Sequence, residues 1–194
     1  MRKAQVKRTT TETAITIHLA IDGTGNSTIT SDIGFFNHML ETFARHGNFD
    51  LEAHITGDLH VDQHHTVEDT GIVLGQAFKK ALGDKKGISR TGFFMVPMDE
   101  AFAMAAVDIC GRPFLKIDTR VTTPVVGDFS TALITDFFQG FAASLGATIH
   151  IKVYYGRSDH HKIEAIFKAF GKAVRDACAV DPRCSDIPST KGIL

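Results

Sequence analysis

Apolar residues recur at intervals of three, four and seven in two stretches that lie 96 residues apart. The matching positions are Val67, Leu74, Phe78, Ala81 and Leu82 in the first stretch and Ile163, Phe170, Val174, Ala177 and Cys178 in the second. This spacing places the apolar side chains on one face of a helix. Polar residues at 62–63 and 158–159 are suitable N-caps, and Gly83 is a suitable end for the first helix. The sequence therefore predicts two similar amphipathic helices.

A weaker repeat lies upstream of each of these helices. Residues 12–23 alternate between polar and apolar, which predicts a strand with one solvent-exposed face, and residues 100–111 form an almost wholly apolar counterpart. The remaining predicted elements are helices at 34–45 and 130–144 and strands at 49–56 and 147–155. Each half then has the approximate order strand, strand, helix, strand, helix.

This order predicts an internally duplicated α+β fold, in which two helices cover one face of a mostly antiparallel sheet in each half. The expected pseudo-repeats are residues 1–92 and 93–194, joined near 85–92 within one compact catalytic unit.

Composition narrows the class of protein. The chain has 194 residues and 43% apolar content, which suffices for one domain or two small fused halves. A net charge of −1 without a long basic block argues against nucleic-acid binding, and no apolar run is long enough for a membrane span. The polar residues 1–12 lack the apolar segment of a signal peptide. Three cysteines without a CxxC motif predict a reduced, cytoplasmic protein.

The strongest chemical signal is a doubled histidine pair, DQHHTVE at 62–68 and SDHHKIE at 158–164. On a helix, His64 and Glu68 share a face, whereas His65 points about 100° away and can serve a different ion. The same geometry holds for His160, His161 and Glu164. Two such units suggest two metal ions, and imidazole with carboxylate but no thiolate suits Mn²⁺, Fe²⁺, Co²⁺ or Zn²⁺. The alternative is two helix starts in which the histidines are incidental.

Two further helices carry candidate site residues. His38 and His46 are two helical turns apart and project from one face, either toward a site or into solvent. In the second half, Asp136 precedes Phe137 and Phe138, so we expect a buried carboxylate that needs a partner such as a metal.

Single cations beside turn residues, Arg90, Arg112 and Lys191, suit recognition of phosphate or carboxylate, or are solvated surface charges. Lys168 follows Glu164 by four residues and either faces the same site or forms a surface ion pair.

Together these residues resemble the imidazoleglycerol-phosphate dehydratase family of histidine biosynthesis, over essentially the whole chain. The matching motifs are GFFNHML (34–40), DQHHTVED (62–69), MDEA (98–101), CGRPFL (110–115), DHHKIEA (159–165) and IPSTKG (187–192). The resemblance implies a homo-oligomer of 24 subunits built from trimers, with active sites between subunits and two Mn²⁺ ions in each.

The resemblance also implies roles for single residues. One ion would be held by His38, His65, His160 and Glu164, and the other by His64, Glu68, Asp136 and His161. The substrate phosphate would meet Arg90, Arg112, Lys168, Ser189, Thr190 and Lys191, while Glu12 and His46 would line the pocket. Position 136 departs from the family pattern, because many members have histidine there.

The implied reaction removes water from imidazoleglycerol phosphate to give imidazole acetol phosphate. The candidate catalytic carboxylates are Glu12, Glu68 and Glu164, and we favour Glu12 for proton transfer because it is not needed as a ligand. Two rival classes remain at this point: a dinuclear metallohydrolase of a phosphate ester and a non-enzymatic metal-binding oligomer.

Overall fold

The computed structural model describes residues 2–192. The elements of the first half are β1 (Lys3–Thr9), β2 (Thr13–Ala20), β3 (Ser27–Thr30), α1 (Gly34–Gly47), β4 (Asp50–Gly57) and α2 (His64–Leu82). Those of the second half are β5 (Thr91–Met98), β6 (Ala101–Asp108), β7 (Phe114–Asp118), β8 (Val125–Val126), β9 (Phe129–Ser130), a 3₁₀ turn (Thr131–Leu133), α3 (Ile134–Leu145), β10 (Thr148–Tyr155) and α4 (Asp159–Cys178). The predicted helices and strands are present, with ends shifted by a few residues.

The two halves build similar four-stranded sheets, with strand orders β1-β2-β4-β3 and β5-β6-β10-β7. In each sheet the last strand of the order pairs parallel to its neighbour, and the other pairs are antiparallel. This confirms the duplicated α+β fold. The predicted order of elements was incomplete, because each half has a third strand, β3 or β7, before its first helix.

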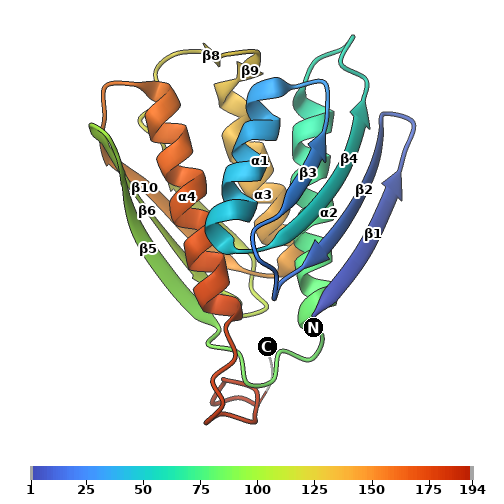
Figure 1. Cartoon of the computed structure of the whole chain (residues 1–194), viewed down its shortest axis with the longest axis vertical. Coiled ribbons are helices and arrows are strands. Elements are labelled where there is room, and N and C mark those ends of the chain that lie inside the picture. Colours follow the sequence, from blue (N-terminus) through green and yellow to red (C-terminus); the bar gives the residue numbers. More distant parts are fainter. Residues whose placement is uncertain (1, 193–194) are drawn as a thin grey trace.

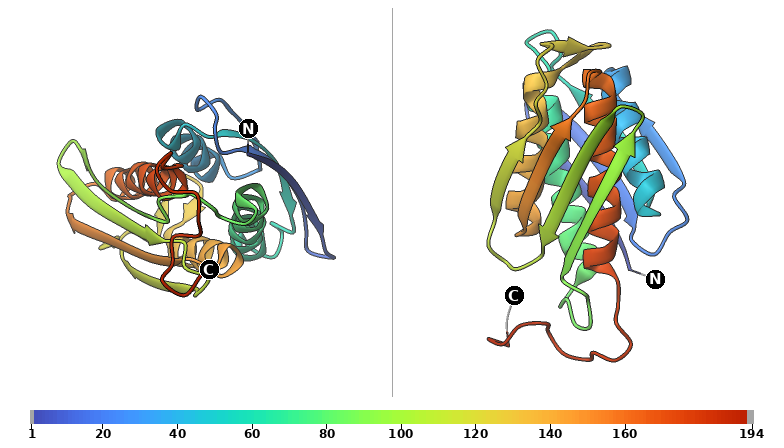
Figure 2. Two further views of the ribbon diagram at one scale, coloured as in Figure 1. Left: turned by 90° about the horizontal axis from the view of Figure 1, so that it is seen from below. Right: turned by 90° about the vertical axis from the view of Figure 1, so that its left-hand side faces the viewer.

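The four helices lie between the two sheets, as the views in Figures 1 and 2 show. Helix α2 packs on β1 and β2, and α4 packs on β5 and β6. The helices also pair across the halves, α2 with α3 and α1 with α4. Buried phenylalanines from all four helices meet at the centre, among them Phe43, Phe78, Phe138, Phe141 and Phe170. Both halves therefore share one core.

The β8–β9 hairpin of the second half forms hydrogen bonds with the starts of α1 and α2 in the first half. The Asp128 carboxylate, between β8 and β9, accepts hydrogen bonds from the backbone N–H groups of Gly34 (2.5 Å) and Phe35 (2.9 Å). These are free donors at the start of α1, and a negative charge there is favourable. The Gln63 side chain, just before α2, donates to the Asp128 carbonyl (2.5 Å) and accepts from Ser130 N–H (3.0 Å). This end of the helix bundle, at the top of Figure 1, carries both histidine pairs.

The three cysteines are unpaired thiols: Cys110 and Cys178 are buried and Cys184 is exposed. Within residues 2–192, none of the helices combines the length and apolar character that crossing a bilayer requires.

Candidate metal centre and active site

Both histidine pairs lie in the first turn of a helix, as predicted. At the start of α4, the hydroxyl of Ser158 accepts a hydrogen bond from His161 N–H (3.3 Å), which fixes the helix N-terminus. At the start of α2, the N-cap Gln63 makes no such bond, and the carboxylate of the preceding Asp62 accepts a hydrogen bond from His64 N–H (2.7 Å). These hydrogen bonds fix the backbone at the start of each helix and therefore the directions in which the histidine side chains project.

One candidate metal centre joins α1 and α4. Ligand atoms of His38, His160 and Glu164 all lie within 4.8 Å of one another. The Glu164 Oε2 atom is 3.9 Å from His38 Nε2 and 3.4 Å from His160 Nε2. Lys168 Nζ is 2.8 Å from the other oxygen, Oε1. Burial opposes ionisation of Glu164, but Lys168 and the two imidazoles hold its pKa below the ordinary value. Two imidazole nitrogens and one ionised carboxylate form a donor set that fits a divalent metal ion.

A second group of candidate ligands joins α2 and α3. His64 Nε2 is 3.6 Å from Glu68 Oε2, and His64 Nδ1 is 3.7 Å from Asp136 Oδ2. The Asp136 carboxylate thus lies beside His64, at the ring nitrogen opposite to the one that faces Glu68. Our expectation of a buried Asp136 was wrong, because its side chain is 36% exposed. The first turn of α3 directs Phe137 and Phe138 into the core and leaves Asp136 at the surface beside α2.

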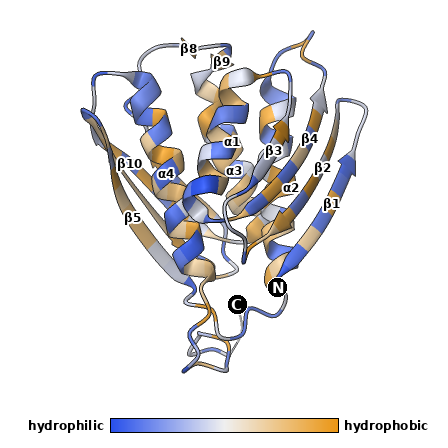
Figure 3. Ribbon diagram, in the orientation of Figure 1, coloured by the Kyte–Doolittle hydropathy of each residue, from blue (hydrophilic) through white to orange (hydrophobic). Residues whose placement is uncertain are grey.

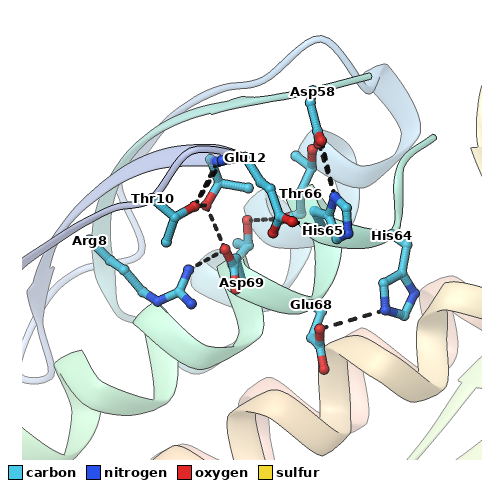
Figure 4. A network of polar contacts seen from close by, with 11 residues as sticks. Arg8, Thr10, Glu12, Asp58, His64, His65, Thr66, Glu68 and Asp69 are labelled. Carbon is cyan, nitrogen blue, oxygen red and sulfur yellow. Dashed lines mark hydrogen bonds and ion pairs between the residues drawn. The ribbon is translucent and has the colours of Figure 1, made fainter. Parts of the chain in front are cut away.

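The second histidine of each pair points away from both groups. His65 lies beside Asp58, with Nδ1 to oxygen distances of 3.1 and 3.2 Å, and its Nε2 is 3.8 Å from Glu12 (Figure 4). His161 Nδ1 is 2.7 Å from Glu100 Oε2, and its Nε2 is 3.9 Å from Asp99. A single chain therefore brings together three of the four ligands expected for one ion, His38, His160 and Glu164, without His65. For the other ion, His64 lies beside Glu68 and Asp136 through different ring nitrogens, and His161 is apart from them.

These carboxylates change the protonation of the outward-facing histidines. Hydrogen bonding to Asp58 raises the pKa of His65, and hydrogen bonding to Glu100 raises the pKa of His161. The His161 ring and neighbouring backbone N–H groups lower the pKa of Glu100 to about 2. Asp58 and Glu100 were not among the residues predicted for the site. For Glu100 a signal was present, because it matches Glu12 in the upstream repeat.

Glu12 lies in the tight turn between β1 and β2. The Thr10 hydroxyl accepts hydrogen bonds from the N–H groups of Glu12 (3.1 Å) and Thr13 (3.0 Å). Below the turn, the buried carboxylate of Asp69 on α2 accepts from the Thr13 hydroxyl (2.5 Å) and pairs with Arg8 (Figure 4). This network fixes the hairpin against α2, while the Glu12 side chain stays 51% exposed beside His65.

The predicted phosphate-binding cations separate into two places. Lys168 joins the α1–α4 centre through Glu164, and His46 lies near it on α1. Burial and the charge of Lys168 lower the pKa of His46.

Arg90 instead lies at the far end of α4, where its N–H donates to the Ala177 carbonyl. The Arg90 guanidinium pairs with both oxygens of Asp108 (2.7 and 3.1 Å) and donates to the Pro188 carbonyl (2.9 Å). The tail carrying Ser189, Thr190 and Lys191 therefore runs beside it. Arg112 is exposed at the same end of the molecule, after β6.

This distribution separates Arg90, Arg112 and Lys191, but not Lys168, from the histidines within one chain. On α4, Ala177 follows His160 by 17 residues. At 1.5 Å per residue, this is about 25 Å. Arg90, Arg112 and the tail therefore cannot share one substrate with the histidine groups of their own chain.

Comparison with known proteins identifies the group to which this arrangement belongs. The sequence profile described as "Imidazoleglycerol-phosphate dehydratase" matches residues 31–174. A protein of that name from Koribacter versatilis is 57% identical, and one from Thermoanaerobacter pseudethanolicus is 55% identical, each over the full length of both chains. The chain belongs to the imidazoleglycerol-phosphate dehydratase family. It is therefore an enzyme of the hydro-lyase class, and the family acts in histidine biosynthesis.

Solved structures of imidazoleglycerol-phosphate dehydratases share this fold. The Staphylococcus aureus enzyme has a TM-score of 0.83 at 37% identity, covering 92% of this chain and 99% of its own. The Pyrococcus furiosus enzyme, solved in complex with (S)-C348, has a TM-score of 0.85 at 35% identity, covering 97% of this chain and 100% of its own.

Proposed function

We propose that the chain is a metal-dependent dehydratase that converts imidazoleglycerol phosphate to imidazole acetol phosphate and water, with two Mn²⁺ ions in each active site. The observation that carries the metal dependence is the convergence of His38, His160 and Glu164 within 4.8 Å. The group of His64, Glu68 and Asp136 supports a second ion, and oxygen ligands suit Mn²⁺. When bound, the ions supply positive charge that stabilises negative charge on the substrate's imidazole ring.

The protein's own groups then account for proton movement. Elimination of water breaks one C–H and one C–O bond, so a base must take the carbon-bound proton and the hydroxyl must leave with a proton. Glu68 and Glu164 are committed to the ligand groups, whereas the Glu12 carboxylate is exposed at the tip of its hairpin. Glu12 therefore takes the proton, and the resulting enol becomes the ketone.

We further propose that the site is completed between copies of the chain. Support comes from the separation of about 25 Å between the histidine groups and Arg90 along α4. Arg90, Arg112, Ser189, Thr190 and Lys191 of one copy would hold the phosphate of a substrate whose ring lies near the histidines, Lys168, His46 and Glu12 of another. The charged guanidinium and ammonium groups suit a phosphate at that position.

The proposed assembly is a homo-oligomer of 24 subunits built from trimers, a number taken from the family resemblance. The outer faces of the two sheets differ in a way that supports association. Lys3, Gln5, Lys7 and Glu52 are exposed on the first sheet. On the second sheet Phe93 is 69% exposed and Tyr155 62%, and Figure 3 shows the apolar colouring along β5. Apolar patches of this kind typically mark protein interfaces. We also propose a cytoplasmic location, which the three free thiols support.

The test is a coupled assay of activity and bound metal. The protein is stripped with a chelator, Mn²⁺ is added back, and ketone formation from imidazoleglycerol phosphate is followed while bound metal is counted. Manganese-dependent turnover with two ions per chain is the expected result. Turnover with one ion would remove Asp136 from the ligands. Release of inorganic phosphate in place of the ketone, or absence of turnover in an intact metal-loaded assembly, would overturn the proposal.

A further inference from the structure

The two hairpin glutamates occupy equivalent places in the duplicated fold. Glu12 immediately precedes β2, and Glu100 immediately precedes β6. Each therefore lies in the turn of the hairpin that opens its half, close to the second histidine of its own pair. Because the two glutamates have equivalent places in the fold, a difference between their contacts indicates a difference between their roles.

Glu100 uses both of its oxygens. Its Oε2 atom is 2.7 Å from His161 Nδ1, while Oε1 accepts hydrogen bonds from the N–H groups of Ser158 (2.7 Å) and Arg157 (3.2 Å). The carboxylate thus joins the His161 ring to the loop that leads into α4. A carboxylate held at three points has a fixed orientation, and it fixes the ring that it contacts.

In the first half, Asp58 has this role in place of the hairpin glutamate. It directly follows β4, and its N–H donates to the Glu12 carbonyl (3.0 Å). Both oxygens of Asp58 lie against His65 Nδ1. Among residues 2–192, the one ion-pair neighbour of the Glu12 carboxylate is His65 Nε2, at 3.8 Å.

We infer that Asp58 and Glu100 are positioning residues that hold the second histidine of each pair in one tautomer. A neutral imidazole carries a single N–H, and a carboxylate at Nδ1 requires the proton on that atom. The lone pair of Nε2 is then directed outward from His65 and His161, toward a metal ion shared with another copy. Because Asp58 has taken over this task in the first half, Glu12 is left free for proton transfer. This inference rests on the proposed metal-dependent function.

The prediction is a loss of metal affinity in Glu100→Gln and in Asp58→Asn. Loss of an outer partner of a ligating histidine typically lowers metal affinity about 10–100-fold. Glu52→Gln is the matched control, because Glu52 holds His54 at 2.9 Å on the outer sheet face. Glu12→Gln is the second comparison and should keep the parent's affinity. Manganese binding to chelator-treated protein is measured by the electron paramagnetic resonance signal of free Mn²⁺, without substrate.

A spectroscopic measurement separates positioning from a general structural role. The ¹⁵N spectrum of histidine-labelled, metal-free protein at pH 8.5 reports which ring nitrogen carries the proton. The parent should show His65 and His161 protonated at Nδ1, and each variant should lose that signature at its own histidine. Thermal unfolding of the metal-free variants should match the parent.

Three results would overturn the inference: parental affinity in Glu100→Gln and Asp58→Asn, an unchanged tautomer in those variants, or a loss of affinity explained by an equal loss of metal-free stability. If the parent itself binds no Mn²⁺, the proposed function fails first. If the parent binds Mn²⁺ and the variants bind it equally well, the positioning roles alone are wrong.

Discussion

Asp159 joins the start of α4 to the loop after β7, whereas the sequence suggested it only as an alternative to Ser158 for the N-cap. Its side chain is 5% exposed. One oxygen accepts hydrogen bonds from the N–H groups of Thr122 (3.0 Å) and Thr123 (2.7 Å), and the other is 2.7 Å from Lys162 Nζ. Burial opposes ionisation, but Lys162 and the threonine donors hold the pKa of Asp159 well below its ordinary value. The pair anchors the loop after β7.

Replacing Asp159 with Asn should lower the free energy of unfolding by about 3 kcal/mol, because it leaves the Lys162 charge buried without its partner. Adding Lys162→Met should recover part of that loss, since both charges are then removed. Urea unfolding of chelator-treated protein measures both effects. Strictly additive losses in the double variant would show that the two side chains act independently.

The same pair predicts a dependence on pH. A carboxyl group whose pKa is lower in the folded state stabilises the protein fully above its unfolded pKa of about 3.9, and this contribution is lost as the pH falls further. The difference in stability between the parent and Asp159→Asn should therefore shrink below pH 4.

Glu12 gives a prediction about catalysis. Glu12→Gln removes the proton acceptor but keeps the hairpin, whose hydrogen bonds use the Glu12 backbone and the Thr10 hydroxyl. Turnover should fall by about 10²–10⁴-fold, the usual contribution of a general base. Binding of Mn²⁺ and KM should stay near parental values. Normal turnover in a rate assay would remove Glu12 from the mechanism.

At the scale of elements, the helices were predictable, whereas β3, β7 and the short strands β8 and β9 were not. Three- and four-residue periodicity is clear in α1, α2 and α4, because each buries one wide face against a sheet and a neighbouring helix. Strand β3 has four residues, of which Ile29 alone is buried, and β7 has no buried position. Both are edge strands that depend on parallel pairing with β4 or β10. Such long-range pairing leaves little trace in a local pattern.

Close helix packing explains why the duplicated helices carry matched glycines. A Cβ atom added at Gly75 on α2 would lie 2.6 Å from the Phe141 carbonyl oxygen on α3. One added at Gly171 on α4 would lie 2.6 Å from the Phe43 carbonyl oxygen on α1. Both clashes are with backbone, which side-chain rotation cannot relieve. The two pairs of helices that cross between halves therefore need glycine at these points.

Gly75→Ala should accordingly destabilise the protein, although alanine favours a helix by about 1 kcal/mol over glycine at an ordinary position. Overpacking of a tight contact costs about 1–3 kcal/mol, so the net effect should be a lower melting temperature. Gln76→Ala is the control, at the adjacent exposed position of α2. Calorimetry measures the melting temperatures of both variants. A Gly75→Ala protein as stable as Gln76→Ala would contradict the packing argument.

At the scale of the whole molecule, the sequence indicated which histidines and carboxylates were candidates for the site, but it did not indicate which residues from other elements contact them. The helix repeat predicts that His160 and Glu164 share one face of α4, and in the structure His38 on α1 joins them there. The contacts of His65 with Asp58 and of His161 with Glu100 join α2 to the end of β4 and α4 to the β5–β6 turn. Periodicity within one element carries no information about such contacts. The 25 Å between the histidines and Arg90 likewise follows from helix length and topology together.

That separation leads to a prediction about mixed assemblies. Arg90→Ala should remove a side chain that binds the substrate phosphate, and His160→Ala should remove a metal ligand. The phosphate-binding and metal-binding parts of a site are called its two ends. If each site takes these ends from different copies, an assembly of both variants contains sites with an intact histidine group from the Arg90→Ala chain and an intact arginine from the His160→Ala chain. Random mixing of equal amounts gives about a quarter of the sites both intact ends. Coexpression should therefore restore roughly that fraction of turnover.

The control is a chain carrying both substitutions, coexpressed with either single variant. These mixtures lack an intact arginine or an intact His160 in every chain, so turnover should stay at the level of the single variants. A site contained within one chain predicts no recovery in any mixture. Recovery confined to the mixture of Arg90→Ala with His160→Ala would instead show that the two ends of α4 serve different active sites, because each chain then supplies histidines to one substrate and Arg90 to another.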